Sequence, residues 1–309
     1  MTIRLNDRVA IVTGAGGGLG RSHALLLGQL GASVVVNDPG ADLRGDGAQG
    51  GAAQRVVNEI VAAGGKAVAN TDSVADPAGA ARLVGSAVDA FGRLDILVNN
   101  AGILRDRSFI KMGLDDFTGV LDVHLLGTVY CTHAAWPIMN EQKSGRIVVT
   151  TSSSGIGGSF GQSNYGAAKM GVLGLMTCLA LEGARNGVFI NAVSPGAVTR
   201  MTEALMPEAI ARLLKPELVS PAIAWLASDR CTQSGLIVNA MGGYFSRIQL
   251  FETAGVQFDP TADVTIDMVD GAFAQFGDLA NGPQPVRPGP LGDFVPRMQA
   301  MGLLGKDLA

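Results

Sequence analysis

Residues 9–20 read VAIVTGAGGGLG, a β-branched run that passes directly into a glycine-rich turn. An apolar helix-like segment, residues 19–30, follows and ends at Gly31. Such a turn is typical of dinucleotide-binding folds, because glycine lets phosphate oxygens approach the backbone N–H groups at the positive end of a helix. A tight connection without a ligand is the alternative. We expect a pyrophosphate to lie against the turn residues of the spacing GxxxGxG, namely Gly14, Gly18, Leu19 and Gly20.

Polar residues at the ends of the next strands indicate where the rest of a dinucleotide binds. Asp38 ends the second strand, where a carboxylate can accept hydrogen bonds from ribose hydroxyls and repels the 2′-phosphate of NADP. NAD is therefore the expected cofactor, although Asp38 can also begin a turn with Pro39 and the nearby Arg44 keeps NADP open. Because ligands bind at the carboxyl ends of parallel strands, we expect further contacts from Asp72, Ser73, Asn99, Ala101 and Gly102.

Short β-branched runs alternate with helix-like segments over most of the chain, a pattern typical of βαβ units. The expected strands are Val9 to Thr13, Val34 to Asn37, Ala67 to Asn70, Ile96 to Asn99, Ile147 to Thr151, Val188 to Val193 and Leu236 to Asn239. They predict an α/β fold of Rossmann type, a doubly wound parallel seven-stranded sheet with helices on both faces, over residues 1–249. The alternation stops after Gly243, and the closely spaced Pro283, Pro285, Pro288 and Pro290 indicate a C-terminal extension, residues 250–309.

Composition and charge exclude several classes of protein. The net charge is −4 and there is no long run of Lys or Arg, so no nucleic-acid partner is expected. Charges within residues 1–8 argue against a signal peptide, and the apolar run 172–181 is shorter than the ~20 residues of a membrane span, so we expect a cytoplasmic protein with no membrane partner. Three widely spaced cysteines and three histidines predict neither a disulfide framework nor a metal site.

Tyr165 and Lys169 are the strongest candidates for chemistry. Their spacing of four places both side chains on one face of a helix. A phenol has an ordinary pKa of about 10, and a nearby ammonium group together with an oxidised nicotinamide favours the phenolate, which makes Tyr165 an acid or base near neutral pH. Ser152 ends the fifth strand, where its hydroxyl can donate to a substrate oxygen, although a merely polar strand end is the alternative.

Together these residues resemble the short-chain dehydrogenase/reductase family. The motifs are TGxxxGxG at 13–20, NNAG at 99–102, Ser152, YxxxK at 165–169 and Pro195-Gly196, and the resemblance covers residues 5 to 245. It implies that Tyr165 is the catalytic acid/base, Lys169 its activator and ribose ligand, and Ser152 the hydroxyl that positions the substrate. It also implies cofactor contacts from Pro195, Gly196, Val198 and Thr199.

His124 departs from the common pattern of the family, which has a catalytic Asn at this point. An imidazole can also donate and accept in a proton relay, so His124 is kept as a catalytic candidate, with a satisfied helix residue as the alternative. Histidine is also found here in the similar (3R)-hydroxyacyl-CoA dehydrogenase units of peroxisomal multifunctional enzymes type 2. Their resemblance, seen again in residues 102–109 and 164–169, implies an NAD-dependent enzyme acting on (3R)-3-hydroxyacyl-CoA or 17β-hydroxysteroids, here as a stand-alone bacterial-type relative.

The loop 195–221 is the expected source of substrate specificity. Its residues Met201, Leu205 and Met206 can close over an acyl or steroid body, or belong to the core. Arg105, Arg107 and Lys111 can meet a coenzyme A phosphate or form a solvated surface. The apolar helix-like segment 167–181 predicts a homodimer or homotetramer, and the extension is expected to cover a neighbouring subunit's pocket. An NADP-linked 3-oxoacyl reductase and a non-catalytic NAD-sensing protein stay open as other functions.

Overall fold

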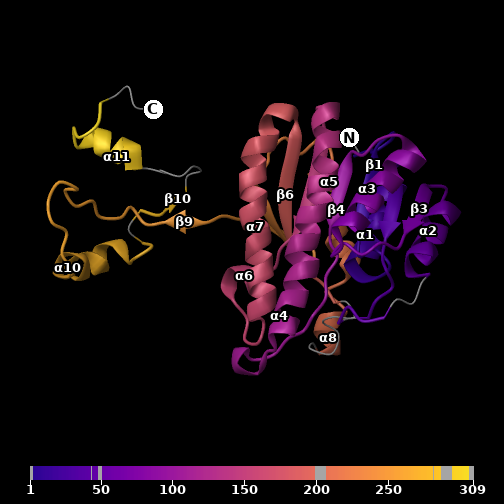
Figure 1. Ribbon diagram of the computed structural model, residues 1–309, viewed down its shortest axis with the longest axis horizontal. Coiled ribbons are helices and arrows are strands. Elements are labelled where there is room, and N and C mark those ends of the chain that lie inside the picture. Colours follow the sequence, from indigo (N-terminus) through magenta and orange to yellow (C-terminus); the bar gives the residue numbers. More distant parts are fainter. Residues whose placement is uncertain are drawn as a thin grey trace. The chain divides into compact units, whose positions relative to one another are not determined.

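Eight strands form one sheet in the part of the chain that this computed structural model describes, residues 3–42, 44–47, 51–198, 207–280, 282–286 and 294–305, in the order β3-β2-β1-β4-β5-β6-β7-β8 (Figure 1). The strands are β1 (Val9–Thr13), β2 (Ser33–Asn37), β3 (Lys66–Asn70), β4 (Ile96–Asn99), β5 (Gly145–Thr150), β6 (Val188–Gly196), β7 (Ile237–Met241) and β8 (Tyr244–Ile248). Neighbours from β3 to β7 run parallel. The Rossmann-type doubly wound fold is therefore confirmed.

The eighth strand corrects the expected count of seven. Gly242 and Gly243, with φ of 57° and 83°, join β7 to β8. Two residues with positive φ between two strands are typical of a tight hairpin turn, and a Gly-Gly pair is one of its sequence signals. The regular alternation of strands and helices does end after Gly243, but one more edge strand follows before the extension.

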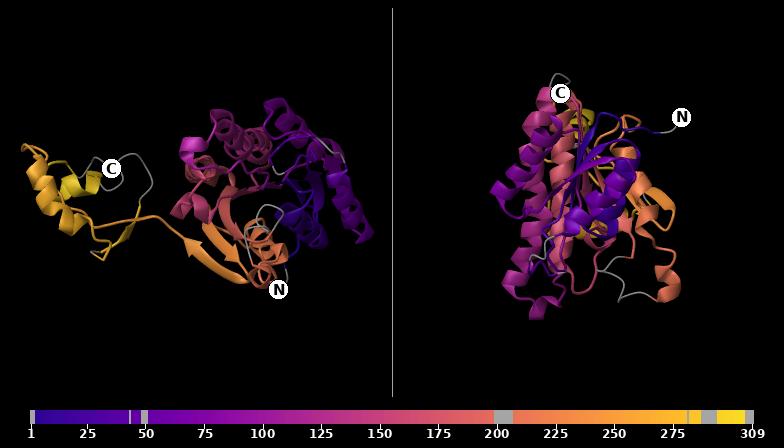
Figure 2. Two further views of the ribbon diagram at one scale, coloured as in Figure 1. Left: turned by 90° about the horizontal axis from the view of Figure 1, so that it is seen from below. Right: turned by 90° about the vertical axis from the view of Figure 1, so that its right-hand side faces the viewer.

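Helices cover both faces of the sheet (Figure 2). Those of the larger unit are α1 (Gly18–Gln29), α2 (Ala52–Ala62), α3 (Pro77–Phe91), α4 (Leu114–Leu121), α5 (Gly127–Gln142), α6 (Ser153–Gly157), α7 (Ser163–Gly183), α8 (Glu208–Ala211) and α9 (Ser220–Leu226), with the short turns η1 (Phe109–Lys111), η2 (Asp122–Leu126), η3 (Ala184–Asn186) and η5 (Pro216–Leu218). On one side α5 lies between α3 and α7, and on the other α1 packs against α2 and α9. Strands buried on both faces account for the continuous apolar runs of the sequence.

Helix α7, extended by η3 to Asn186, is the one helix of the described residues that is long and apolar enough to cross a membrane, judged by length and composition alone. In the fold it packs against β6, α4 and α6, and Ala168, Val172 and Met176 are fully buried. Packing against the sheet and its covering helices explains one face of this apolar helix, whereas only 39 % of its most apolar stretch is buried.

The chain divides into two compact units, Met1–Arg247 and Ile248–Ala309, two residues before the boundary expected from the sequence. The smaller unit holds β9 (Phe251–Glu252), β10 (Gln284–Pro285), α10 (Ile266–Phe276) and α11 (Phe294–Ala300). Among its described residues, Met298 is the one buried apolar side chain. The expectation that this smaller unit covers a neighbouring subunit's pocket stays a prediction.

Asp95 links several segments of the chain at the amino-terminal end of the sheet. Its carboxylate is 2 % exposed, accepts hydrogen bonds from Arg8 and Arg93, and receives the backbone N–H of Val9 at 2.9 Å. Burial by itself raises the pKa of Asp95, but these hydrogen bonds outweigh it and hold the pKa below its ordinary 3.8. The ionised carboxylate therefore stabilises the folded chain.

Replacing Asp95 with Asn should lower the free energy of unfolding by about 2 kcal/mol at pH 7, because two guanidinium groups lose their buried partner. The native pKa of Asp95 is lowered, so its contribution is present above pH 3.8 and is lost as the pH falls through the native value. Urea unfolding of wild type and Asp95→Asn from pH 7 to pH 3 should show curves that converge at low pH. Asp229→Asn, at an exposed partner of the same Arg8, is the control and should change stability by less than about 0.5 kcal/mol. Curves that stay parallel down to pH 3 would contradict this account.

Candidate active site

A cleft of about 450 Å³ opens at the carboxyl ends of the strands, where the strand order reverses between β1 and β4. It brings together most of the residues selected from the sequence: Gly14, Gly18, Leu19, Gly20, Asp38, Ser73, Ala101, Gly102, His124, Ser152, Tyr165, Lys169, Pro195 and Gly196. Residues from segments as far apart as β1 and α7 thus face a single cavity.

The glycine turn is held against the end of β4 by backbone contact. Gly14 has a φ of +61°, and a Cβ there would lie 2.7 Å from Ala101 Cα, so only glycine fits. Thr13 Oγ1 accepts the N–H groups of Asn100 and Ala101 at 2.9 and 3.0 Å, and the Asn100 amide donates to the carbonyls of Thr13 and Gly14. The turn therefore has a fixed shape.

The same turn has free N–H groups for an anion. Gly17 is the N-cap of α1, and no side chain caps this helix end. A Cβ at Gly17 would meet nothing within 4 Å, so space lies directly over the first turn of the helix. An uncapped helix N-terminus facing a cleft fits the pyrophosphate of a dinucleotide.

Asp38 sits beside this turn with its carboxylate already oriented. Oδ2 accepts the N–H of Gly16 at 2.9 Å, and Oδ1 accepts the N–H of Gly40 at 2.7 Å. Asp38 therefore forms a turn with Gly40 and also lies in the cleft, so its roles as turn residue and as ribose ligand are compatible. The residues present fit NAD: the turn would hold its pyrophosphate, Asp38 its adenosine ribose, and Tyr165 and Lys169 would lie at its nicotinamide end.

Among the described residues, three expected cofactor ligands do not line the cleft. Asp72 bonds to Arg82 and Asn70. Asn99 donates to Thr132 beneath the cleft, because successive residues of a strand point to opposite faces and Asn100 takes the cleft side instead. Val198 donates its N–H to the carbonyl of Leu214, while Thr199 lies outside the described residues, as do Met201, Leu205 and Met206.

Ser152, Tyr165 and Lys169 form one cluster at the other end of the cleft. Lys169 Nζ donates to the carbonyl of Thr150 at 2.7 Å and lies 5.5 Å from the centre of the Tyr165 ring. Ser152 caps α6 by accepting the N–H of Ser154, and its side chain is close enough to Tyr165 to lower the pKa of the phenol. Ser152 and Tyr165 therefore line the same end of the cleft.

Burial controls the charges of this cluster. It raises the pKa of Tyr165, an effect that the Ser152 side chain only partly opposes. It lowers the pKa of Lys169 to about 7, so the amine is partly neutral at neutral pH. Without a cofactor, burial thus favours the neutral forms of both groups, and the expectation that the lysine and an oxidised nicotinamide together make the phenol more acidic stays a prediction.

His124 lies in η2, a single π-helical turn between α4 and α5. Its Nε2 is 3.0 Å from the nitrogen and 2.8 Å from the oxygen of Ile103, and its ring meets Tyr165 edge-on at 5.1 Å. Burial, then the charge of Lys169, lowers its pKa well below 6.5, so the ring is neutral. A Cβ on Gly102 would lie 2.2 Å from His124 Cε1, so the imidazole fills the space that this glycine leaves open. Nδ1 finds no partner among the described residues, so the ring both anchors the loop after β4 and keeps one nitrogen unused.

Two of the three basic residues expected to meet a coenzyme A phosphate are engaged with the chain itself. Arg105 donates to the carbonyl of Arg44, and both Arg105 and Arg107 lie within 4 Å of the Asp116 carboxylate. The fully buried Asn164, which was not selected from the sequence, donates to the carbonyls of Arg105 and Asp116 and fixes this loop to the start of α7. Its position immediately before Tyr165 was the available signal.

Comparisons with known proteins agree with this geometry. A family model described as "short chain dehydrogenase" matches residues 8–209. The chain is 47 % identical over 280 residues to the peroxisomal multifunctional enzyme type 2 of Drosophila melanogaster, covering 90 % of this chain but only 46 % of that protein. The full-length structure of that enzyme has a TM-score of 0.79 at 38 % identity, covering 97 % of this chain and 50 % of that one.

Two shorter relatives match over nearly their whole length. The short-chain type dehydrogenase/reductase Rv0148 of Mycobacterium tuberculosis is 47 % identical over 276 residues, covering 89 % of this chain and 96 % of that protein. A 7α-hydroxysteroid dehydrogenase solved with NADH and a 7-oxo bile acid has a TM-score of 0.70 at 28 % identity, covering 78 % of this chain and 95 % of that one.

Replacing Lys169 with Met should make the chain more stable at pH 7 while removing activity. Burial lowers the pKa of Lys169 from 10.5 to about 7, so between these values the unfolded chain binds more protons and wild-type stability rises with pH. Each unit of the lowering corresponds to about 1.4 kcal/mol. The gap in unfolding free energy between Lys169→Met and wild type, measured in urea, should shrink by about 1 to 4 kcal/mol from pH 7 to pH 10.5. The exposed Lys66→Met is the matched control; a gap independent of pH for Lys169→Met would sink the prediction.

Proposed function

The chain is an oxidoreductase of the short-chain dehydrogenase family, and we propose that it oxidises a secondary alcohol to a ketone with NAD. The substrate we propose is a (3R)-3-hydroxyacyl-CoA, with 17β-hydroxysteroids as the second class. One observation carries the proposal: a single cleft joins an uncapped glycine turn, the oriented carboxylate of Asp38, and the cluster of Ser152, Tyr165 and Lys169.

The residues of the cluster have separate tasks in the proposed reaction. When bound, the oxidised nicotinamide accepts the hydride and adds the positive charge that lowers the pKa of the phenol. Tyr165 accepts the proton of the substrate hydroxyl through its side-chain oxygen. Ser152 donates to the same substrate oxygen and holds it at the tyrosine. Lys169, fixed by the carbonyl of Thr150, then lies where it can exchange that proton near neutral pH.

The substrate class rests on the relatives and on the apolar side of the cleft. Leu104, Val123, Leu214 and Met241 are among the residues that line it and suit an acyl or steroid body. The relative from Drosophila is named a peroxisomal multifunctional enzyme, and this chain spans about half of its length. Because Arg105 and Arg107 pair with Asp116, the coenzyme A phosphates would rely on other groups.

We propose that the enzyme works as a cytoplasmic homodimer or homotetramer. Met170 and Leu181 on the outer face of α7 are 37 % and 58 % exposed. A second subunit on this face would cover them.

Straight-chain (3R)-3-hydroxyacyl-CoA thioesters should give a higher kcat/KM with NAD than 17β-hydroxysteroids do. Tyr165→Phe should lower kcat about 10³-fold with unchanged NADH binding, because the ring stays and only the proton acceptor goes. NADH absorbance measures turnover and fluorescence titration measures binding. Lack of turnover with both substrate classes would refute the substrate, whereas turnover that survives in Tyr165→Phe would refute the mechanism. A protein that binds NADH but turns over no alcohol would be the NAD sensor.

Asp38→Asn should shift cofactor preference from NAD towards NADP. The change removes a charged acceptor for the ribose hydroxyls and the repulsion of a 2′-phosphate, so the ratio of kcat/KM values should fall at least tenfold, or about 1.4 kcal/mol. Asp42→Asn is the control, because Asp42 also lines the cleft but caps its own loop. A wild type that prefers NADP would favour the 3-oxoacyl reductase alternative.

A further inference from the structure

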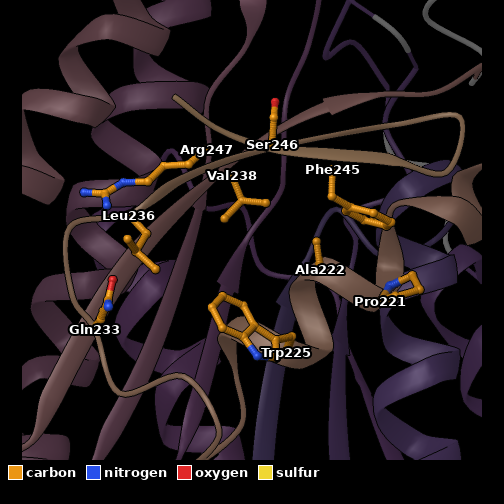
Figure 3. A pocket seen from close by; sticks show the side chains of 9 residues that line it. All are labelled: Pro221, Ala222, Trp225, Gln233, Leu236, Val238, Phe245, Ser246 and Arg247. Atoms are coloured by element: carbon orange, nitrogen blue, oxygen red, sulfur yellow. The ribbon is translucent and has the colours of Figure 1, made fainter. Parts of the chain in front are cut away.

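A second cavity, of about 540 Å³, lies between α9 and the strands β7 and β8 (Figure 3). Trp225 of α9 forms its floor, Val238 of β7 its centre and Phe245 of β8 one end. Trp225 and Phe245 remain 39 % and 47 % exposed, although both face the hollow. The walls are therefore apolar surface that the rest of the unit leaves uncovered.

The opposite end of the cavity is polar. The guanidinium of Arg247 extends over Leu236 towards Gln233 (Figure 3). Arg247 is the one charged residue among those that line the cavity; it is exposed, and no carboxylate among the described residues of the same unit, Met1–Arg247, pairs with it. A lone cation at one end of an apolar hollow is complementary to a molecule with one anionic group and an apolar body.

The cavity has the size of a small-molecule site. Pockets for drug-sized ligands have volumes of roughly 300 to 1,000 Å³, are mostly apolar and contain a few polar groups that fix orientation. None of the cavity's residues belongs to the cleft described above, so an occupant here leaves the cleft free.

We propose that this cavity binds an amphipathic monocarboxylate, with its chain against Trp225, Val238 and Phe245 and its carboxylate on Arg247. The chain is stabilised by the burial of apolar surface, and the head group by a charge-assisted hydrogen bond. An experiment can separate the two contributions, because an uncharged alcohol of the same length keeps the apolar burial and lacks the charge-assisted hydrogen bond.

The test is a titration of the full chain, saturated with NADH, with decanoate and with decanol, followed by tryptophan fluorescence and calorimetry. Decanoate should bind more tightly than decanol. Arg247→Gln should weaken decanoate about 5-fold and leave decanol unchanged, whereas the exposed Arg55→Gln should change neither. Val238→Phe, which fills the centre, should weaken both ligands at least tenfold and keep the dehydrogenase activity.

Other outcomes overturn the proposal. Decanoate affinity that survives Val238→Phe would place the ligand elsewhere, and an equal loss for both ligands in Arg247→Gln would remove the role of the charge. A fall in sedimentation mass of Val238→Phe, with no ligand bound by wild type, would make this face a contact between copies of the chain. If Val238→Phe fails to fold, the contrast between decanoate and decanol in Arg247→Gln decides alone.

Discussion

The carboxyl ends of β1 and β4 meet through backbone atoms, and the arrangement of the cleft depends on this contact. A Cβ on Gly14 would lie 2.7 Å from Ala101 Cα, so the turn and the loop after β4 are placed together or not at all. Thr13 and Asn100 close the contact with four hydrogen bonds. The turn then leaves the N-terminus of α1 uncapped, and the loop after β4 continues to Ile103, where it meets the imidazole of His124.

At the far end of the cleft, burial raises the pKa of Tyr165 and lowers the pKa of Lys169. Both shifts favour the neutral form of the group. The phenol of Tyr165 becomes harder to ionise and the amine of Lys169 easier to deprotonate. A buried pair of this kind is held near electrical neutrality until a charged ligand arrives, so the chain's own groups leave the activating charge to the cofactor. The fold retains an ionisable amine that weakens it, which is typical of a site shaped by function rather than stability.

Strands, the glycine turn and the catalytic cluster followed from the sequence because each depends on local pattern: β-branched runs, glycine spacing, and the four-residue spacing of Tyr165 and Lys169. Asn99 and Asn100 show where local pattern fails, since only the pleat of β4 decides which amide faces the cleft. The ion pair of Asp72 was also out of reach, because its partner, Arg82, comes from the next helix. The pKa of Lys169 depends on burial, which no spacing reveals.

The imidazole of His124 occupies the space that a side chain at Gly102 would need. The imidazole stands where a side chain on the glycine would be, with Cε1 2.2 Å from the position of that Cβ. Asparagine at 124 would leave a hollow above the loop, and any larger residue at 102 would expel the ring. The constraint therefore runs one way: the histidine requires glycine at 102, whereas Gly102 can remain when the smaller asparagine stands at 124.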